Sequence, residues 1–161
     1  MDIKNVIDFL KNYDKEELNF MEVCGTHTAS ISENGIPSII SPKIHLISGP
    51  GCPVCVTASS YIDKLIELSR DNVIVTFGDM IRVPGSKCSL YDVKSDSADI
   101  RLVYSPLDII SIAKAEPLKS FIFAAVGFET TTPIYAILIE KLIEEKINNV
   151  SLLTALKTMP N

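Results

Sequence analysis

The chain has 161 residues, carries 20 Asp and Glu against 15 Lys and Arg, and is 47% hydrophobic. This length fits one domain, or one domain and the start of another. The hydrophobic residues are sufficient for a core that needs no disulfide or metal to stabilise it, which excludes a disordered or fibrous protein. The net charge of -5, with no basic tail, argues against nucleic acid as a partner.

The amino-terminal segment 1–12 lacks the apolar centre of a signal peptide, and no run reaches the ~18 apolar residues of a membrane span. We therefore expect a cytoplasmic protein without a membrane partner. In that compartment, four cysteines are too few for a disulfide framework, and they indicate catalysis, redox chemistry or metal binding.

Apolar residues recur at helical spacing near the start of the chain, at Ile3, Val6, Ile7 and Leu10, and predict an amphipathic helix. After it, apolar runs of strand length alternate with stretches of helical periodicity. This alternation predicts an α/β fold with an open, mostly parallel, Rossmann-like sheet flanked by helices. The expected strands are 18–23, 44–47, 73–77, 100–104, 121–126 and 150–154, and the expected later helices are 26–34, 58–69, 107–115 and 133–146.

The segment 84–99 is polar and rich in serine, and it predicts a long irregular loop. Cys88 lies in this loop with no partner at a diagnostic spacing, so we expect no role for it. A break in the pattern after residue 117 predicts a domain boundary, with a first α/β domain at 1–117 and the beginning of a second, truncated α/β domain at 118–161.

Most of the predicted strands run directly into a cluster of Gly, Pro, Thr, Asp, Ser or Cys residues. In open α/β sheets, ligands bind beyond the carboxyl ends of the strands. The sequence therefore predicts that these clusters lie on one edge that binds a ligand. The clusters are 24–28, 49–55, 78–80, 105–106 and 127–133.

Cys52 and Cys55 form a Cys-x-x-Cys pair after a strand and at, or just before, a helix start. Amide groups and the helix dipole stabilise a thiolate there, as a dithiol that exchanges with a disulfide requires. Redox or transient metal chemistry is therefore favoured over a structural role. A zinc knuckle needs a second pair of Cys or His at comparable spacing, which the chain lacks.

Cys24 and His27 are three residues apart at another strand-to-helix turn, where Thr26 or Thr28 can cap a helix that begins near Thr26. Thiolate and imidazole together suit iron, zinc or copper. Taken alone, the pair fits equally well a small buried cysteine and a solvated histidine. The residues leave both interpretations open.

The segment 127–133 predicts a strand end, a threonine helix cap and Pro133 at the first helical position. Capping accounts for one threonine of the three, and clustered hydroxyls and amides at a helix start can also receive a small anion. The threonines of this predicted anion site are Thr130, Thr131 and Thr132.

Five motifs, read together and in order, resemble the HypD family of hydrogenase maturation factors. The resemblance spans nearly the whole chain and covers about the N-terminal half of a usual member. The motifs are Met-Glu-Val-Cys-Gly-Thr-His-Thr at 21–28, Gly-Pro-Gly-Cys-Pro-Val-Cys at 49–55, Phe-Gly-Asp-Met-Ile-Arg-Val-Pro-Gly at 77–85, Val-Tyr-Ser-Pro-Leu-Asp at 103–108 and Gly-Phe-Glu-Thr-Thr-Thr-Pro at 127–133.

The resemblance implies a function in the assembly of the iron centre of nickel-iron hydrogenases. Members of the family help to build the iron that carries cyanide and carbon monoxide, the Fe(CN)2CO unit, working with the small chaperone HypC and receiving cyanide from HypE. The chain is then expected to be a scaffold and redox partner in this assembly rather than a turnover enzyme.

The same resemblance implies roles for individual residues. Cys24 matches the cysteine that holds iron together with a cysteine of HypC, and His27 matches a neighbouring histidine that supports the site or moves protons. Cys52 and Cys55 match a redox pair that passes electrons between a 4Fe-4S cluster and the iron. A loop of the facing α/β domain is matched by Thr130, Thr131 and Thr132.

The sequence departs from the family pattern in two places. The cysteines that hold the 4Fe-4S cluster belong to the C-terminal part of the family, so we expect no such cluster on this chain. At 154–157, Leu156 stands where the family usually has a histidine. Two alternatives stay open: a small cytoplasmic thiol-disulfide oxidoreductase that uses Cys52 and Cys55, and an inactive half-length form. Only the iron scaffold requires Cys24.

Overall fold

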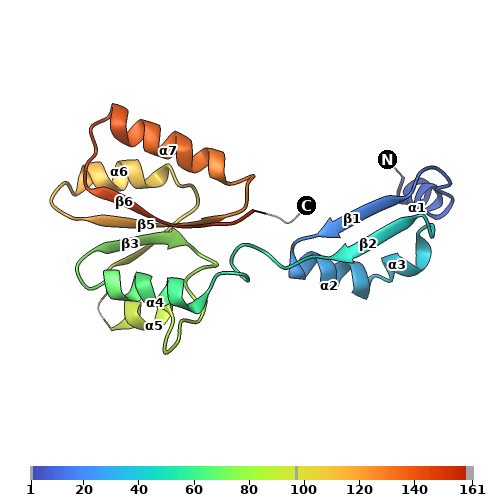
Figure 1. Ribbon diagram of the computed structural model, residues 1–161, viewed down its shortest axis with the longest axis horizontal. Helices are drawn as coiled ribbons and strands as arrows, with labels where there is room; N and C mark the ends of the chain where they lie inside the picture. The colour runs from blue at the N-terminus through green and yellow to red at the C-terminus, as the bar shows by residue number, and fades with distance from the viewer. Residues whose placement is uncertain (1, 97, 159–161) are drawn as a thin grey trace. The chain divides into compact units, whose positions relative to one another are not determined.

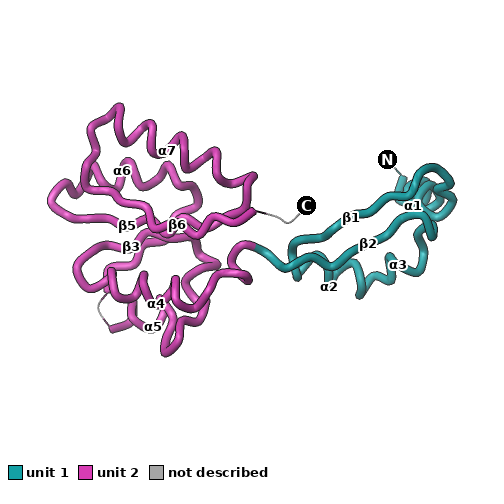
Figure 2. The backbone as a smooth tube through the Cα atoms, in the orientation of Figure 1, with its two compact units in different colours: residues 1–52 teal, residues 53–161 magenta. Residues whose placement is uncertain are grey.

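The structure is a computed structural model that describes residues 2–96 and 98–158. The chain divides into two compact units, unit 1 at Met1–Cys52 and unit 2 at Pro53–Asn161 (Figure 2). In the described part, all pairings between the named strands are parallel, and helices flank the sheets. The predicted α/β class with an open parallel sheet is confirmed.

Unit 1 contains a two-stranded sheet in which Leu18 lies opposite Ile44 and Glu22 lies opposite Ser48. Two short helices form the crossover between the strands (Figure 1). The elements of unit 1 are α1 (Ile3–Lys11), β1 (Leu18–Glu22), α2 (Gly25–Glu33), α3 (Ile36–Ile39) and β2 (Ile44–Ser48).

The end of α1 is fastened to the connection between α3 and β2. The amide of Ser41 donates a hydrogen bond to the carbonyl of Leu10 at 2.9 Å, and the Ser41 hydroxyl donates to the carbonyl of Tyr13 at 2.6 Å. Lys43 pairs with Asp14 at 2.6 Å, but both side chains are exposed and the pair contributes little stability. The buried serine is therefore the main polar link between α1 and the rest of unit 1.

Unit 2 is a three-layer sandwich in which α4 and α5 cover one face of a four-stranded sheet and α6 and α7 cover the other (Figure 1). The strand order is β4-β3-β5-β6. The elements of unit 2 are α4 (Ser59–Leu68), β3 (Val73–Phe77), α5 (Leu90–Ser95), β4 (Ile100–Val103), α6 (Asp108–Ala115), β5 (Phe121–Gly127), α7 (Thr132–Glu144) and β6 (Val150–Leu156).

The core of unit 2 lies on both sides of its central strands. Successive side chains of a strand point to opposite faces, so Ile74 packs in the layer with α4 and α5, whereas Val75 packs in the layer with α6 and α7. In the second layer the buried Tyr135 donates its hydroxyl hydrogen to the carbonyl of Val126 at 2.9 Å. Burial on both faces explains why β5 is a largely continuous apolar run and why β3 is apolar except for the buried Thr76.

The division of the chain differs from the predicted one. The expected boundary after residue 117 falls between α6 and β5, and these two elements belong to the same sandwich because β5 pairs with β3, with Val73 opposite Phe121. The boundary between the two compact units lies after Cys52 instead. Within residues 2–96 and 98–158, no helix is both long and apolar enough to cross a membrane.

Candidate functional site

Cys24 is the residue at which β1 gives way to α2. It occupies the N-cap position, with extended backbone angles φ -114° and ψ 118°, and its carbonyl accepts the amide of Thr28 at 3.0 Å. The helix thus begins at Gly25, one residue earlier than predicted, and Thr26 and Thr28 lie in its first turn instead of capping it. Cys24 stands at the amino end of α2, where the helix dipole favours an anionic group.

Glu22 joins Cys24 and His27 in one cluster. Its carboxylate oxygen Oε1 accepts the amide hydrogen of Cys24 at 2.8 Å and lies 3.4 Å from Nδ1 of His27. The His27 side chain is 69% exposed and that of Glu22 is 30% exposed. The structure therefore brings the predicted pair together around a carboxylate that sequence reasoning missed. The available signal was a glutamate at the end of an apolar strand, two residues before the cysteine.

Gly49 brings the end of β2 against this cluster. Its amide donates to the carbonyl of Glu22 at 2.8 Å, and a Cβ atom at position 49 would lie 2.8 Å from that same oxygen and 3.0 Å from Cγ of Met21. Only glycine allows this approach. A pocket of about 80 Å³ beside the cluster is lined by Glu22, Thr28, Ile31, Ser32, Pro37, Leu46, Ile47 and Ser48.

Cys52 and Cys55 flank the start of a tight turn that Thr57 closes. The amide of Thr57 donates to the carbonyl of Val54 at 3.1 Å, and its hydroxyl donates to the carbonyl of Pro53 at 2.8 Å. Cys52 is partly buried and Cys55 is exposed. The second cysteine is thus accessible to a reactant from solution.

The helix that follows this turn begins later than the sequence predicted. α4 starts at Ser59, one residue later than expected, and Cys55 lies in the turn just before the helix, which is one of the two placements that the sequence predicted. Of the two glycines in the preceding loop, Gly51 has the positive φ of 101° that glycine tolerates. Gly49 has a different role, the close approach to Glu22 described above.

The threonine cluster begins α7 in unit 2. Thr131 is the N-cap residue as the pattern predicted, but Pro133 is the second helical residue and not the first. The amides of Thr131 and Thr132 donate to the carbonyls of Phe128 and Glu129 at 2.9 and 3.3 Å, so the turn itself uses these two donors. An anion site at these threonines stays a prediction.

Gly127 ends β5 directly beneath this cluster. A Cβ atom at position 127 would lie 2.5 Å from Cβ of Thr131, so the turn can fold back onto the strand only over a glycine. The Gly127 carbonyl accepts the amide of Lys157 at 3.0 Å, which holds the end of β6 alongside. The motif is therefore a tightly packed strand-to-helix junction.

The predicted ligand-binding edge is divided between the two sheets. The clusters of Cys24 and Gly49 follow the carboxyl ends of β1 and β2 in unit 1. The clusters that begin at Gly78, Ser105 and Gly127 follow the ends of β3, β4 and β5 in unit 2. Each sheet thus presents its own set of motifs.

Among the described residues, no group of three or more His, Cys, Asp or Glu side chains could hold a metal ion. Cys88 lies in a tight turn of unit 2, where its carbonyl accepts the amide of Gly85 at 2.9 Å. A 4Fe-4S cluster normally requires four thiolates from one site, so the described residues do not fit such a cluster.

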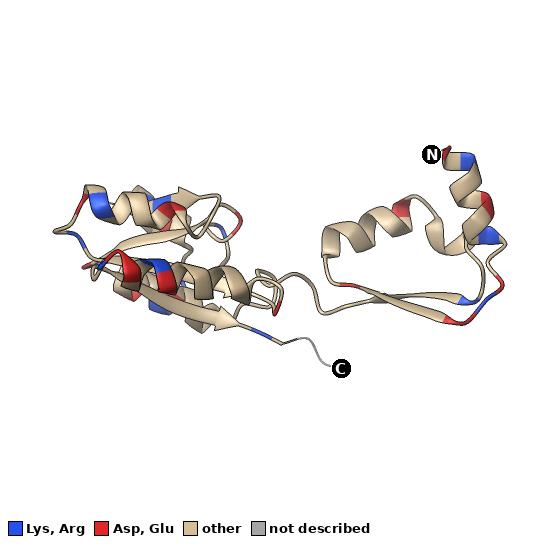
Figure 3. Ribbon diagram, turned by 90° about the horizontal axis from the view of Figure 1, so that it is seen from above, with Lys and Arg blue, Asp and Glu red and all other residues tan. Residues whose placement is uncertain are grey.

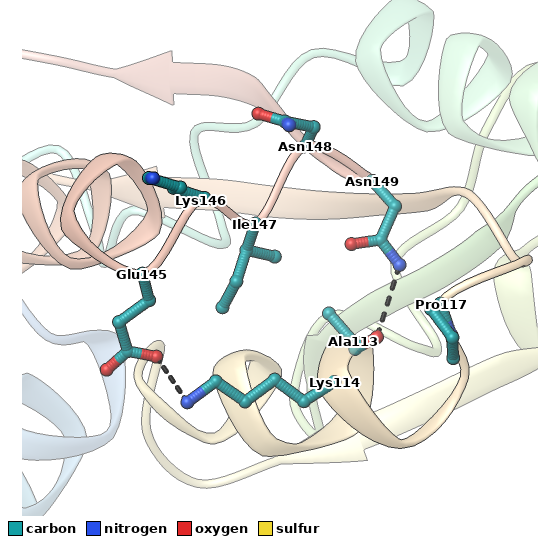
Figure 4. Close-up of a pocket in the computed structure, with 8 residues that line it drawn as sticks. All are labelled: Ala113, Lys114, Pro117, Glu145, Lys146, Ile147, Asn148 and Asn149. Atoms are coloured by element: carbon teal, nitrogen blue, oxygen red, sulfur yellow. Dashed lines mark hydrogen bonds and ion pairs between the residues drawn. The ribbon is translucent and has the colours of Figure 1, made fainter.

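A larger pocket of about 500 Å³ lies at the other end of unit 2, near the beginning of β6 (Figure 4). Lys114 and Glu145 form an ion pair across it at 2.5 Å. Beside it, the Asn149 amide nitrogen Nδ2 lies 3.2, 3.4 and 3.0 Å from the carbonyl oxygens of Ala113, Glu116 and Lys119 and donates to them. No predicted site residue lines this pocket, so we do not place the site there.

Known proteins resemble this chain along most of its length. The family model HypD, described as the hydrogenase formation hypA family, matches residues 2–161. The hydrogenase maturation factor HypD of Rhodobacter capsulatus is 43% identical over 161 residues, which cover 99% of this chain and 43% of that protein. A hydrogenase expression/formation protein of Methanocaldococcus jannaschii is 40% identical, covering 98% and 45%. HypD of Escherichia coli is 40% identical over 134 residues, covering 82% and 36%. The chain spans less than half the length of these relatives.

Proposed function

Because this chain belongs to the HypD family, we propose that it serves in hydrogenase maturation as a scaffold and redox partner for the Fe(CN)2CO unit, together with HypC and HypE. The names of the relatives support the hydrogenase connection, since they are called hydrogenase maturation or formation proteins. In this proposal iron is a cargo that the protein holds during assembly. The chain acts as an assembly factor and not as a turnover enzyme.

The arrangement of Glu22, Cys24 and His27 is the observation that carries the proposal. Cys24 lies at the amino end of α2, and its sulfur is of the type that binds a transition metal as the thiolate. The carboxylate of Glu22 fixes the Cys24 amide and faces one nitrogen of the His27 ring. A histidine held in this way can orient a ligand or move a proton beside the bound iron.

The described residues contain no group of three metal-binding side chains, which is consistent with an iron site that this chain shares with HypC. One thiolate of this chain and one of HypC would hold the iron between two proteins, and separation of the two proteins would release it. Cys52 and Cys55 would supply reducing equivalents, because conversion of two thiols to one disulfide releases two electrons and two protons. Two equivalents of an external thiol would then restore the dithiol and would themselves be oxidised to a disulfide.

The test compares Cys24→Ser with Cys88→Ser in the chain co-expressed with HypC. Serine is a good helix cap, so α2 should remain folded in the first variant although the thiolate is lost. We expect Cys24→Ser to lose iron and co-purified HypC to background and Cys88→Ser to keep both, measured by metal analysis and by the amount of HypC retained. Equal retention by the two variants would remove Cys24 from the iron site.

A second function is favoured by the exposure of Cys55 in its tight turn. A thiol-disulfide oxidoreductase would reduce a small disulfide substrate with Cys52 and Cys55 and would have no need of Cys24. If Cys55→Ser abolishes such turnover while Cys24→Ser leaves it unchanged and neither change affects iron, the oxidoreductase replaces the scaffold. If neither activity is found, the inactive half-length form remains.

A further inference from the structure

Unit 1 has almost no core of its own. Among its described residues only Ser41 and Ile44 are buried, whereas unit 2 contains two buried apolar clusters. A sheet of two strands is marginally stable at best in water, and three or more strands with a packed face are needed for independent stability. Unit 1 therefore does not contain all the elements of a stable α/β layer.

Apolar side chains are exposed on both faces of the β1–β2 sheet. Phe20 and Leu46 are opposite each other on one face and are 53% and 38% exposed. Met21 and Ile47 are opposite each other on the other face and are 46% and 41% exposed. Parallel sheets occur in proteins almost only with both faces covered, so this pattern is that of an internal sheet whose covering layers are incomplete.

The edges of both strands are open to further pairing. Leu18 donates its amide to Lys43, and Gly49 donates its amide to Glu22, which identifies the backbone groups that face the partner strand. Backbone groups of a strand alternate in direction, so those of the intervening residues face outward. The outward-facing residues are Asn19 and Met21 in β1 and Leu46 and Ser48 in β2, whereas the amide of Ile44 already donates to the carbonyl of Ser41 at 3.0 Å.

Neither strand carries the features that normally protect an edge. β1 has the sequence LNFME and β2 has the sequence IHLIS, with no Lys, Arg or Pro in either. In unit 1 the basic residues lie in α1 and the connections that lead into the two strands, and most of both strands is uncharged (Figure 3). Natural edge strands avoid association through lysine, proline or bulges, so these two strands are suited to pairing with another polypeptide.

We propose that unit 1 is one part of a composite sheet, completed by the polypeptide that forms the remaining part of the longer relatives. More than half of the Rhodobacter capsulatus protein lies outside the aligned region, since this chain covers 43% of it. That polypeptide adds at least one parallel strand by main-chain hydrogen bonds and covers Phe20, Met21, Leu46 and Ile47. The proposal goes beyond the assembly role and holds whether or not iron binds.

The first measurement is amide hydrogen exchange on the 161-residue chain alone. We expect the amides of Asn19, Met21, Leu46 and Ser48 to exchange at least a hundredfold faster than those of β3 and β5, because they face the open edges of the two-stranded sheet and unit 1 opens readily without its missing layers. Slow exchange at these four amides in the monomeric chain would overturn the proposal.

The second measurement adds the part of the Rhodobacter capsulatus protein outside the aligned region as a separate polypeptide. We expect a one-to-one complex in which exchange of the four amides slows at least tenfold. The double variant Phe20→Lys/Met21→Lys should weaken binding at least tenfold. Ile137→Lys, a matched control at an exposed isoleucine of unit 2, should leave the affinity unchanged.

Three outcomes of the binding experiment contradict the proposal. The first is a failure of the two polypeptides to associate. The second is a complex that forms without slowing exchange in β1 and β2, which would mean that the added polypeptide binds elsewhere. The third is a dimer of the 161-residue chain that protects the same amides, which would make a second copy the occupant of these edges.

Discussion

The amide of Gly49 donates a hydrogen bond to the carbonyl of Glu22 across 2.8 Å, and a side chain at position 49 would meet that same oxygen. The end of β2 is thereby held against the residue whose carboxylate accepts the amide of Cys24. The motif at 21–28 and the start of the motif at 49–55 are thus joined through both the backbone and the side chain of Glu22. Substitution of Gly49 or Glu22 should therefore alter the backbone around Cys24 although the Cys24 sulfur itself is unchanged.

Gly49→Ala is expected to separate the ends of β1 and β2, because the new methyl group must move the Glu22 carbonyl or the Met21 side chain. Overpacking of this kind costs about 1–3 kcal/mol. Amide exchange at Glu22–Cys24 should accelerate, and iron retained with HypC should fall. Gly25→Ala is the control, since no atom lies within 4 Å of its added Cβ. Equal behaviour of the two variants would show that the close approach at position 49 is unimportant.

Two substitutions of Glu22 should distinguish the effect of its hydrogen bond with the Cys24 amide from the effect of its charge beside His27. Glu22→Gln keeps an oxygen that can accept the Cys24 amide but removes the charge that faces His27, whereas Glu22→Ala removes both. Loss of the hydrogen bond costs about 1 kcal/mol. We expect amide exchange at Cys24 to accelerate in Glu22→Ala only and iron retention to fall in both variants. Unchanged iron retention in Glu22→Ala would leave Glu22 without a role at the site.

Cys52 and Cys55 should form a reversible intramolecular disulfide, because proline restricts the loop that carries them, Gly51 permits its positive φ of 101°, and Thr57 closes the following turn. Peptide mapping of the oxidised protein by mass spectrometry identifies the linkage, and titration against a thiol buffer measures its reversibility. A link from Cys52 to Cys24 or Cys88, or no disulfide at any potential, would remove the proposed relay of electrons.

Anaerobic reconstitution with iron and sulfide should give no stable 4Fe-4S cluster. The described residues contain no group of three or more metal-binding side chains, and a cluster normally takes four thiolates from one folded site. Absorption spectroscopy and iron analysis of the monomer after gel filtration provide the measurement. One cluster for each monomer would show that the cysteines have been assigned to the wrong roles.

Acid should destabilise unit 2 through Asp99 and Glu116. Hydrogen bonds from Arg101, and secondarily from Lys119, lower the pKa of each carboxyl to about 2. Because these pKa values are lower in the folded than in the unfolded state, the carboxylates stabilise the fold above about pH 4, and this contribution is lost as the pH falls toward 2.

The check is urea unfolding measured by circular dichroism at several pH values. Arg101→Gln should flatten the fall in unfolding free energy between about pH 5 and 2, because the carboxyl pKa values return toward those of the unfolded chain. Lys64→Gln, which breaks the exposed pair with Glu67, is the control and should change the curve little. Parallel curves for the wild type and Arg101→Gln would contradict the assignment.

Local sequence patterns predicted most helices and strands because these depend on nearby residues. The helix α5 was missed, although Ser89 and Asp92 form a capping box that is visible in the sequence as Ser-x-x-Asp. The serine content of this stretch predicts a loop, but one of the serines, Ser89, caps the helix. Serine favours both structures, so composition alone does not distinguish them.

The pairing of strands and the division into units could not be predicted in the same way. The runs at 44–47 and 73–77 are both apolar, yet Leu46 and Ile47 are exposed whereas Ile74 and Val75 are fully buried. Burial depends on which distant strand pairs with which, and no local pattern contains that information. The Cys24 and His27 pair was predicted from spacing, but the contact of Glu22 with both residues depends on the fold of the turn.

The side-chain amide of Asn149 holds the end of α6, the following turn and the start of β6 together through three carbonyl groups. An amide nitrogen has two hydrogens, so the three acceptors share two donors. Hydrolysis of this amide, a slow chemical change that asparagine undergoes with age, would replace the donor with a carboxylate and place negative charge against three carbonyl oxygens. Deamidation of Asn149 would thus replace three stabilising hydrogen bonds in unit 2 with electrostatic repulsion between a carboxylate and three carbonyl oxygens.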